Sequence, residues 1–212
     1  MTADEERVPR HYPAHLMDVQ RLPGARRLLL RPILPQDHES LAELMADLSP
    51  AARRNRFHGM LRPSGSELRR MCTVDYRRHL ALTVSVEAHG TEQIVAEARY
   101  CVATDDESAE FAVLVHEAWQ RRGIGTWTIC TLERAARDAG LNWLTGTVLR
   151  DNKAMLRLLR RLGFVLTPDR TDERLIQAER RLDKRVACGN RCVGIERWLR
   201  RSASWLSVRG RR

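Results

Sequence analysis

Hydrophobic and polar residues alternate along this chain in patterns that separate strands from helices. Short apolar or alternating runs predict strands, and runs at helical spacing bounded by cap residues predict helices. The predicted strands are 28–33, 80–86, 91–102, 109–115, 141–149, 164–166 and 173–182. The predicted helices are 35–48, 50–57, 66–72, 123–139 and 152–162.

The order of these elements predicts the fold class. One strand and several helices precede three consecutive strands, after which helices and strands alternate. This order is typical of an α+β (α/β) domain with a mixed sheet. We expect a polar N-terminal arm at 1–20, a single domain at 21–183 and a C-terminal tail at 184–212.

A glycine-containing turn, Gln120-Arg-Arg-Gly-Ile-Gly-Thr126, lies between the strand at 109–115 and the following helix. Glycine lets a backbone approach a ligand closely, and the N–H groups of a helix start point at an anion. The turn therefore suits a phosphate group, although an ordinary strand-to-helix turn can have the same pattern.

Charge is concentrated at the C-terminal end. The formal net charge is +10, and from Lys184 onward nine basic residues and one acid give +8. The remainder of the chain is nearly balanced, so the charge does not indicate that the whole protein binds nucleic acid.

The tail also has residues at helical spacing that predict a basic amphipathic helix: Ile195, Trp198, Leu199, Ser202, Trp205 and Leu206. Such a helix suits an anionic membrane surface, nucleic acid or an acidic partner. Alternatively, its tryptophans pack on the domain or mediate oligomerisation with a second subunit.

Composition excludes several classes of protein. No run of about 18 apolar residues is present, so we expect no transmembrane segment. The acidic start, Met1–Glu6, has no apolar core behind it, so we expect no signal peptide. Cys188 and Cys192 make at most half a metal site, and we expect no metal. Reduced cysteines in a cytoplasmic protein fit best.

Two motifs resemble the GNAT superfamily of acyl-CoA-dependent N-acyltransferases. Gln120-Arg-Arg-Gly-Ile-Gly125 is similar to that family's pyrophosphate-binding motif, and Asn152-Lys-Ala-Met155, running to Phe164, to its second signature. The resemblance implies a single GNAT fold, with a mostly antiparallel sheet splayed between strands 4 and 5 and flanked by helices. It also implies acetyl-CoA as co-substrate.

A narrower resemblance, over about residues 12–182, is to the GNAT domain of bacterial protein lysine acetyltransferases of the Pat type. Its residues are Tyr12-Pro-Ala-His, Leu30-Arg-Pro-Ile, Leu48-Ser-Pro, Arg56-Phe57, Val74-Asp75-Tyr76 and Ala109-Glu110-Phe111. Many relatives carry a fused acyl-CoA-synthetase-like region or a cyclic-nucleotide-binding domain, and we expect neither here. The resemblance implies acetyl transfer to a lysine ε-amine of a protein, with acyl-CoA synthetases as a candidate partner.

The resemblance further implies where the donor binds. Backbone N–H groups of the turn suit the pyrophosphate, and Arg121 and Arg122 either contact phosphate or are solvated surface charges. The end of the fourth strand should meet the pantetheine amides like an added strand, and Asn152 should cap a helix and reach the cofactor. The expected cofactor-binding residues are Val113, Leu114, Val115, Gln120, Arg121, Arg122, Gly123, Ile124, Gly125, Thr126, Asn152 and Met155.

Glu110 is the expected general base. The two-residue period of a strand places it on one face with Ala112 and Leu114. Its apolar neighbours predict partial burial, which would raise the pKa of its carboxyl and make it a better base. A buried ion pair with an arginine is the structural alternative. In the Pat-type family the matching glutamate is catalytic; Glu107 and Glu117 are weaker candidates here.

The expected chemistry is direct attack of the amine on the thioester, because no cysteine lies in a recognisable nucleophile setting. Backbone N–H near Leu114 could stabilise the oxyanion. Many relatives protonate the leaving thiolate with a tyrosine, but Leu159 stands at the matching position. A thiol with a pKa of roughly 8.5 is a tolerable leaving group unaided.

Two other functions fit the same motifs. The acceptor could be a small amine, such as a polyamine, an antibiotic or an amino acid. The protein could also be a non-enzymatic acyl-CoA sensor or a nucleic-acid binder that uses the basic tail.

Overall fold

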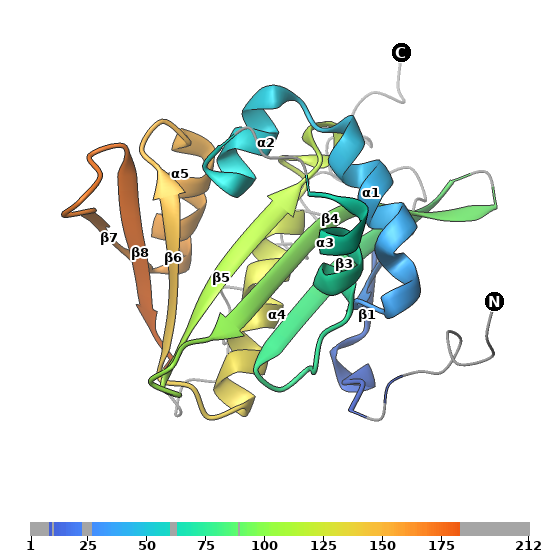
Figure 1. Ribbon diagram of the computed structural model, residues 1–212, viewed down its shortest axis with the longest axis horizontal. Coiled ribbons are helices and arrows are strands. Elements are labelled where there is room, and N and C mark those ends of the chain that lie inside the picture. Colours follow the sequence, from blue (N-terminus) through green and yellow to red (C-terminus); the bar gives the residue numbers. More distant parts are fainter. Residues whose placement is uncertain (1–8, 10, 23–26, 60–62, 89, 183–212) are drawn as a thin grey trace, which may run out of the picture.

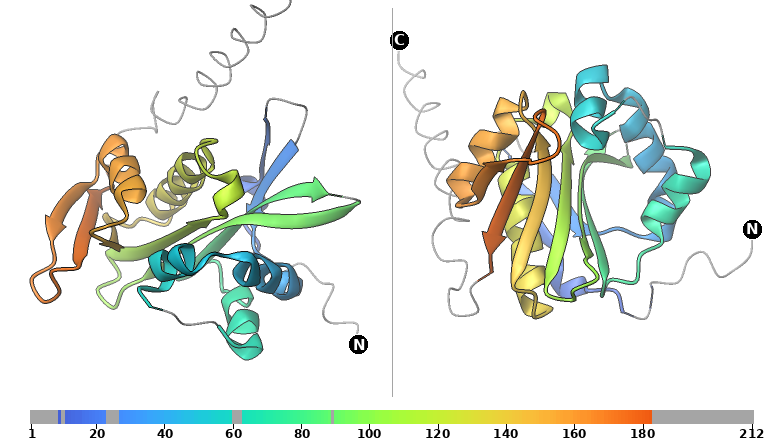
Figure 2. Two further views of the ribbon diagram at one scale, coloured as in Figure 1. Left: turned by 90° about the horizontal axis from the view of Figure 1, so that it is seen from above. Right: turned by 60° about the vertical axis from the view of Figure 1, so that its left-hand side comes forward.

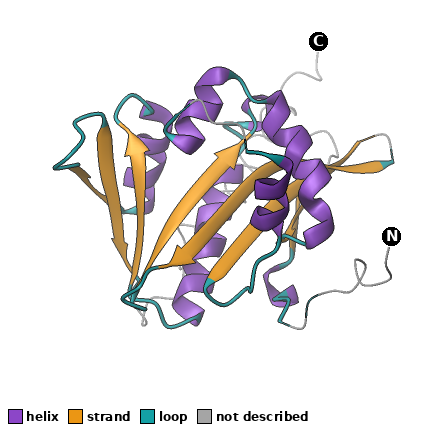
Figure 3. Cartoon of the chain, in the orientation of Figure 1, coloured by secondary structure: helices purple, strands orange, loops and turns teal. Residues whose placement is uncertain are grey.

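The computed structural model describes residues 9, 11–22, 27–59, 63–88 and 90–182. One eight-stranded mixed sheet organises them, with strand order β1-β2-β3-β4-β5-β6-β8-β7 (Figures 1 and 3). The strands are β1 (Asp18–Arg21), β2 (Arg27–Pro32), β3 (His79–Ala88), β4 (Thr91–Val102), β5 (Ser108–Val115), β6 (Trp143–Leu149), β7 (Val165–Pro168) and β8 (Leu175–Arg181).

Helices lie on both sides of the sheet. Figure 2 shows α4 and α5 on one side and the first three α-helices on the other. The α-helices are α1 (His38–Asp47), α2 (Pro50–Phe57), α3 (Gly65–Cys72), α4 (Ile124–Asp138) and α5 (Lys153–Leu162). Single-turn 3-10 helices are η1 (Ala14–Leu16), η2 (Pro35–Asp37) and η3 (Glu117–Trp119).

Side-chain alternation divides the interior into two cores. On β5, Ala109 and Phe111 pack in the core shared with α4 and α5, whereas Leu114 packs with α1 and α3. This confirms the predicted faces of that strand. Ser49 Oγ accepts a hydrogen bond from Ala52 N and caps the start of α2.

Each predicted helix and strand is present with small shifts at its ends, and the expected GNAT fold class is confirmed. The sequence did not predict β1, which pairs antiparallel with β2. Within the expected arm at 1–20, Leu16 is buried and Asp18 starts this strand. Because of β1, the predicted fourth and fifth strands are β5 and β6.

β5 and β6 are parallel and separate soon after they meet. Their register runs only from Ser108–Trp143 to Glu110–Thr145. Just beyond, Phe111 lies against Gly146, where an added Cβ would be 2.7 Å from Phe111 Cε1. The Phe111 ring also packs on Phe164, with ring centroids 5.3 Å apart. A glycine is therefore required where the two strands begin to part.

We predict that Gly146→Ala destabilises the fold by roughly 1–3 kcal/mol, because the added methyl overpacks the Phe111 ring. Urea unfolding would measure this. Gly65→Ala in α3 is the matched control: no atom lies within 4 Å of its added Cβ. Alanine there should leave stability unchanged or raise it slightly. A Gly146→Ala protein as stable as the wild type would contradict this packing.

Candidate functional site

The parting of β5 and β6 opens into a cavity of about 1320 Å³. Its walls come from β5, the turn after it, the start of α4, β6, α5 and the C-terminal end of α2. The cavity lies beyond the carboxyl ends of two parallel strands, the usual place for ligands in open α/β sheets.

This one cavity brings together all the predicted site residues except Arg122. Those that line it are Glu110, Val113, Leu114, Val115, Gln120, Arg121, Gly123, Ile124, Gly125, Thr126, Asn152 and Met155. The Arg122 guanidinium instead lies 5.1 Å from the centroid of Trp119 and donates to the Ala118 carbonyl at 3.2 Å. These contacts favour the surface role for Arg122.

The turn after β5 has the backbone of an anion site. Gly123 is the N-cap of α4 with φ 86°, and Arg121 has φ 60°. Left-handed residues in a turn direct successive N–H groups toward one point. A non-glycine residue in this region costs about 1 kcal/mol, and such strain concentrates at functional sites. The backbone of the turn thus supports the phosphate-binding expectation.

The second glycine of the motif has a different role. Gly125 lies in the first turn of α4, where an added Cβ would be 3.1 Å from Leu158 Cδ2 of α5. It lets the two helices approach each other beside the cavity. Of the two glycines in this motif, only Gly123 adopts the left-handed backbone that favours glycine.

Two polar side chains fix the ends of the neighbouring elements. Gln120 Nε2 donates to the Val115 carbonyl at 3.0 Å, which ties the turn to the end of β5. Asn152 Oδ1 accepts from Met155 N at 3.1 Å and caps α5. The expected capping role of Asn152 is confirmed, and its contact with the cofactor stays a prediction.

Glu110 is exposed at the edge of the cavity, and the expectation of partial burial is wrong. The cause is the arrangement of helices, because α1–α3 leave this part of β5 uncovered (Figure 1). The buried ion pair is not seen either, since no partner of the Glu110 carboxylate is found among the described residues. Its neighbours in register are Cys101 on β4 and Thr145 on β6.

The buried carboxylate beside the cavity is Glu97, which the sequence analysis missed. It lies on β4 opposite Leu114 and is fully buried. Arg56 Nη2 lies 3.2 Å from its Oε2, and Arg99 Nε donates to its Oε1. Burial alone would raise the pKa of Glu97, but the two guanidinium groups outweigh burial and hold that pKa below its usual value.

This ionic network holds two helices against the sheet. Arg56 comes from α2 and lines the cavity, while Arg99 Nη2 donates to the Met71 carbonyl of α3 at 3.3 Å. Glu97 therefore positions the wall of the cavity on the side away from α4 and α5.

Among the described residues, no tyrosine takes the place of the one that many relatives use to protonate the leaving thiolate. Leu159 is completely buried in the core, and none of the described tyrosines lines the cavity. Cys101 is half-buried beside Glu110, and burial raises the pKa of its thiol. A raised pKa leaves little reactive thiolate, which agrees with the expectation of direct attack.

Several lining residues were not predicted. Among them are Asn55, Arg56 and Phe57 of α2, His58 directly after it, Thr147 and Val148 of β6, and Arg157, Arg160 and Arg161 of α5. The α5 arginines could have been found, because their spacing of three and four residues puts them on one side of the helix that Asn152 starts. The α2 residues are distant in sequence and carry no such signal.

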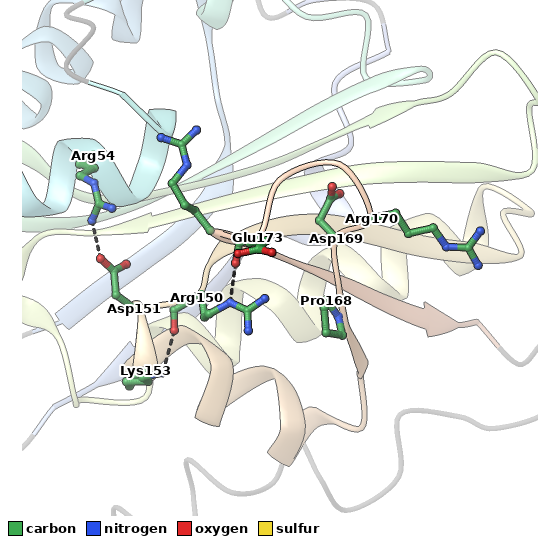
Figure 4. Close-up of a pocket in the computed structure, with 9 residues that line it drawn as sticks. Arg54, Arg150, Asp151, Lys153, Pro168, Asp169, Arg170 and Glu173 are labelled. Atoms are coloured by element: carbon green, nitrogen blue, oxygen red, sulfur yellow. Dashed lines mark hydrogen bonds and ion pairs between the residues drawn. The ribbon is translucent and has the colours of Figure 1, made fainter.

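A smaller cavity of about 880 Å³ lies next to this one (Figure 4). Arg54 of α2 and Asp151, which form an ion pair of 2.6 Å, contribute to its wall. Asp169 accepts hydrogen bonds from Thr171 and Gln177, which hold the pKa of its carboxyl far below the usual range. Charges of both signs, partly paired with each other, give this cavity no single ligand chemistry.

Over the described residues, no cluster of three or more His, Cys, Asp or Glu side chains could hold a metal ion. No helix in that part of the chain is long and apolar enough to cross a membrane. Cys188, Cys192 and the tail at 184–212 lie outside the described residues.

Comparison with known proteins agrees with the resemblance found in the sequence. Residues 27–165 match the family model described as an acetyltransferase (GNAT) domain. Acetyltransferase PA5475 of Pseudomonas aeruginosa is 29% identical over 155 residues, 73% of this chain and 83% of that protein. Acetyltransferase Pat of Mycolicibacterium smegmatis is 31% identical over 137 residues, 64% of this chain and 40% of that protein. The chain therefore spans well under half the length of this second relative.

Solved structures share the fold. The GNAT domain of S. lividans PAT superimposes with a TM-score of 0.72 at 23% identity, covering 81% of this chain and 99% of that one. YncA of Salmonella typhimurium, solved with acetyl-CoA, gives 0.57 at 21% identity over 76% of this chain and 96% of that one.

We predict that Glu97→Gln lowers the free energy of unfolding by about 3–5 kcal/mol at neutral pH, because two partly buried arginines lose their buried charged partner. The effect should depend on pH. The folded-state pKa of Glu97 lies below its unfolded value near 4.3, so its stabilisation is complete above that value. It is lost as the pH falls through the folded-state pKa.

Urea unfolding of both proteins from pH 7 to pH 3 would measure this difference, which should shrink below about pH 4. Glu43→Gln, an exposed acid on α1, is the control and should change little. A difference that stays constant down to pH 3 would contradict the role of the Glu97 charge.

Proposed function

The chain belongs to the GNAT acetyltransferase family, and we propose that it transfers an acetyl group from acetyl-CoA to the lysine ε-amine of a protein. The observation that carries this proposal is the single cavity shared by the anion-binding turn, the parted strands and Glu110. Each of these three parts suits one portion of the reaction.

The turn and α5 suit the phosphates of the donor. Gly123 and Arg121 orient backbone N–H groups at the positive end of α4. Arg157, Arg160 and Arg161 add side-chain charge to the same cavity. The parted edges of β5 and β6 offer free backbone groups to the amides of pantetheine.

Glu110 suits the acceptor end. A lysine amine has a pKa near 10.4, so it arrives as an ammonium and must lose a proton before it can attack. The exposed Glu110 carboxylate can take that proton directly or through one water. The nitrogen then bonds to the thioester carbon, and the carbon–sulfur bond breaks. The nitrogen gives its second proton to solvent and becomes a neutral amide, and CoA leaves as a thiolate that takes a proton from solvent.

The Pat-type relatives favour a protein as the acceptor. Acetyltransferase Pat is 31% identical to this chain over 137 residues, and the S. lividans PAT domain shares its fold. An acyl-CoA synthetase is the candidate target that the Pat-type family suggests. Transfer to small amines is the rival within the same chemistry. Acetylation of lysate proteins and of free polyamines or amino acids, followed by mass spectrometry, would separate these acceptors.

We predict that Gly123→Ala weakens acetyl-CoA binding at least about tenfold, the loss of roughly one hydrogen bond to a charged group. Alanine strains the left-handed backbone and displaces the N–H groups of the turn. Isothermal titration would measure the affinity.

Gly140→Ala is the matched control for the turn. Gly140 has φ 85°, nearly the same as the 86° of Gly123, but it lies at the other end of α4. Both variants should lose similar stability, and only Gly123→Ala should lose affinity. Equal affinity in the two proteins would remove the turn from the donor site.

We predict that Glu110→Gln keeps acetyl-CoA affinity but lowers the rate of acetyl transfer at least about 100-fold, because the general base is lost. Glu107→Gln, in the preceding loop, should stay active. The chain contains two lysines, Lys153 and Lys184, so intact mass can separate self-acetylation from acetylation of an added acceptor. Full activity of Glu110→Gln would dismiss this base, and binding without transfer in the wild type would favour an acyl-CoA sensor.

A further inference from the structure

The side of the sheet that carries Glu110 continues past the cavity onto β6, β8 and β7, where no helix of the described residues covers it. Figures 1 and 2 show α1–α3 lying over the other half of the sheet, so this side of β6, β8 and β7 faces outward. Two apolar side chains are exposed there: Trp143 at 39% and Val165 at 63%. A sheet face of this kind is available to another molecule.

Strand register places a second acid in line with Glu110. Glu110 pairs with Thr145 on β6, Thr145 pairs with Glu179 on β8, and Glu179 pairs with Val165 on β7. Residues directly opposite each other point to the same side of a sheet. With strands about 4.8 Å apart, the two carboxylates lie about 10 Å from each other.

Glu179 differs from the interior acids of the domain. Glu97 is buried and paired with two arginines, and Glu133 is buried with Arg180 3.0 Å away. Glu179 is exposed, and no hydrogen bond or ion pair of its carboxylate is found among the described residues. It therefore offers a negative charge to an incoming molecule.

The next pair of residues along β6 and β8 on this side of the sheet adds an aromatic ring to the surface. Trp143 lies on the same side, opposite Arg181, and an exposed indole can pack on the stem or the charged head of a lysine or arginine. Thr145 lies between the two carboxylates and can hydrogen-bond a peptide backbone. We call Glu110, Trp143, Thr145 and Glu179 the acceptor face.

We propose that the acceptor face binds the lysine-bearing segment of the acceptor protein, and that Glu179 selects segments with a second basic residue close to the acetylated lysine. This inference rests on the proposed function. Side chains on one side of an extended segment recur about every 6.7 Å. With one lysine at Glu110, a lysine or arginine two or four residues away lies on the same side of the segment and reaches Glu179.

Peptide kinetics test this inference in the intact protein. One synthetic peptide has a central lysine with arginine two positions away, and the other has alanine in place of that arginine. The wild type should have a KM about threefold to fivefold lower for the dibasic peptide, as expected of an exposed charge pair, and added salt should shrink the difference. The value of kcat should be similar for both.

Variants of Glu179 should change this preference alone. Glu179→Gln should abolish it, and Glu179→Lys should raise KM for the dibasic peptide about tenfold over the wild type by adding repulsion. The monobasic peptide and acetyl-CoA affinity should be little affected. Glu87→Lys, an equal charge change at an exposed site of β3, is the control and should keep the preference.

Several results would overturn the inference. One is that the wild type has the same KM for both peptides. Another is that the Glu179 variants lower kcat equally on both peptides. A wild type that acetylates free amines but neither peptide would show that the proposed protein acceptor is wrong, and the inference would fail with it. Failure of Glu179 alone would leave the proposed function intact.

Discussion

Backbone groups on the facing edges of β5 and β6 lose their sheet partners after Glu110 and Thr145. Unpaired backbone groups away from water are costly, so a protein keeps such edges open only where water or a ligand satisfies them. Phe111 against Gly146 fills the base of the opening from the side of α4 and α5. The parting is thus a packed feature of the fold, and it positions both the turn at the start of α4 and Glu110 at the cavity edge.

Two glutamates on one side of the sheet have opposite environments. Glu97 is enclosed by arginines and held ionised, and it fixes α2 and α3 against β4. Glu110, one strand away, is left exposed and without a charged partner in the described part of the chain. Acids of one type can therefore serve different roles, because their surroundings and not their chemistry differ.

Sequence alone predicted the parts of this structure that depend on local order. Alternation on β5, the cap at Asn152 and the glycines of the turn each follow from backbone geometry within a few residues, and those expectations agree with the structure. The burial of the two glutamates could not be predicted from local order in this way. Glu110 and Glu97 both stand among apolar neighbours in sequence, and which one is covered depends on where α1–α3 pack.

Other features of the site and the fold could be found only from the folded structure. The strand β1 is polar and short, and its pairing with β2 could not be read from periodicity. The lining residues of α2 reach the cavity through the Arg56–Glu97 contact across 41 residues of sequence. The charge of Arg122 suggested a phosphate contact, but an aromatic ring three residues away holds it elsewhere.

The two sides of the sheet divide the charges of the proposed reaction. Arginines of α5 and the turn lie toward the polyanionic donor, and Glu110 and Glu179 lie toward the cationic acceptor. Acetylation converts the ammonium to a neutral amide, which ends its attraction to carboxylates, whereas CoA keeps every phosphate. An arrangement that recruits a cation through exposed acids therefore weakens its hold on the acceptor as soon as the reaction is complete, while the donor side still binds its product.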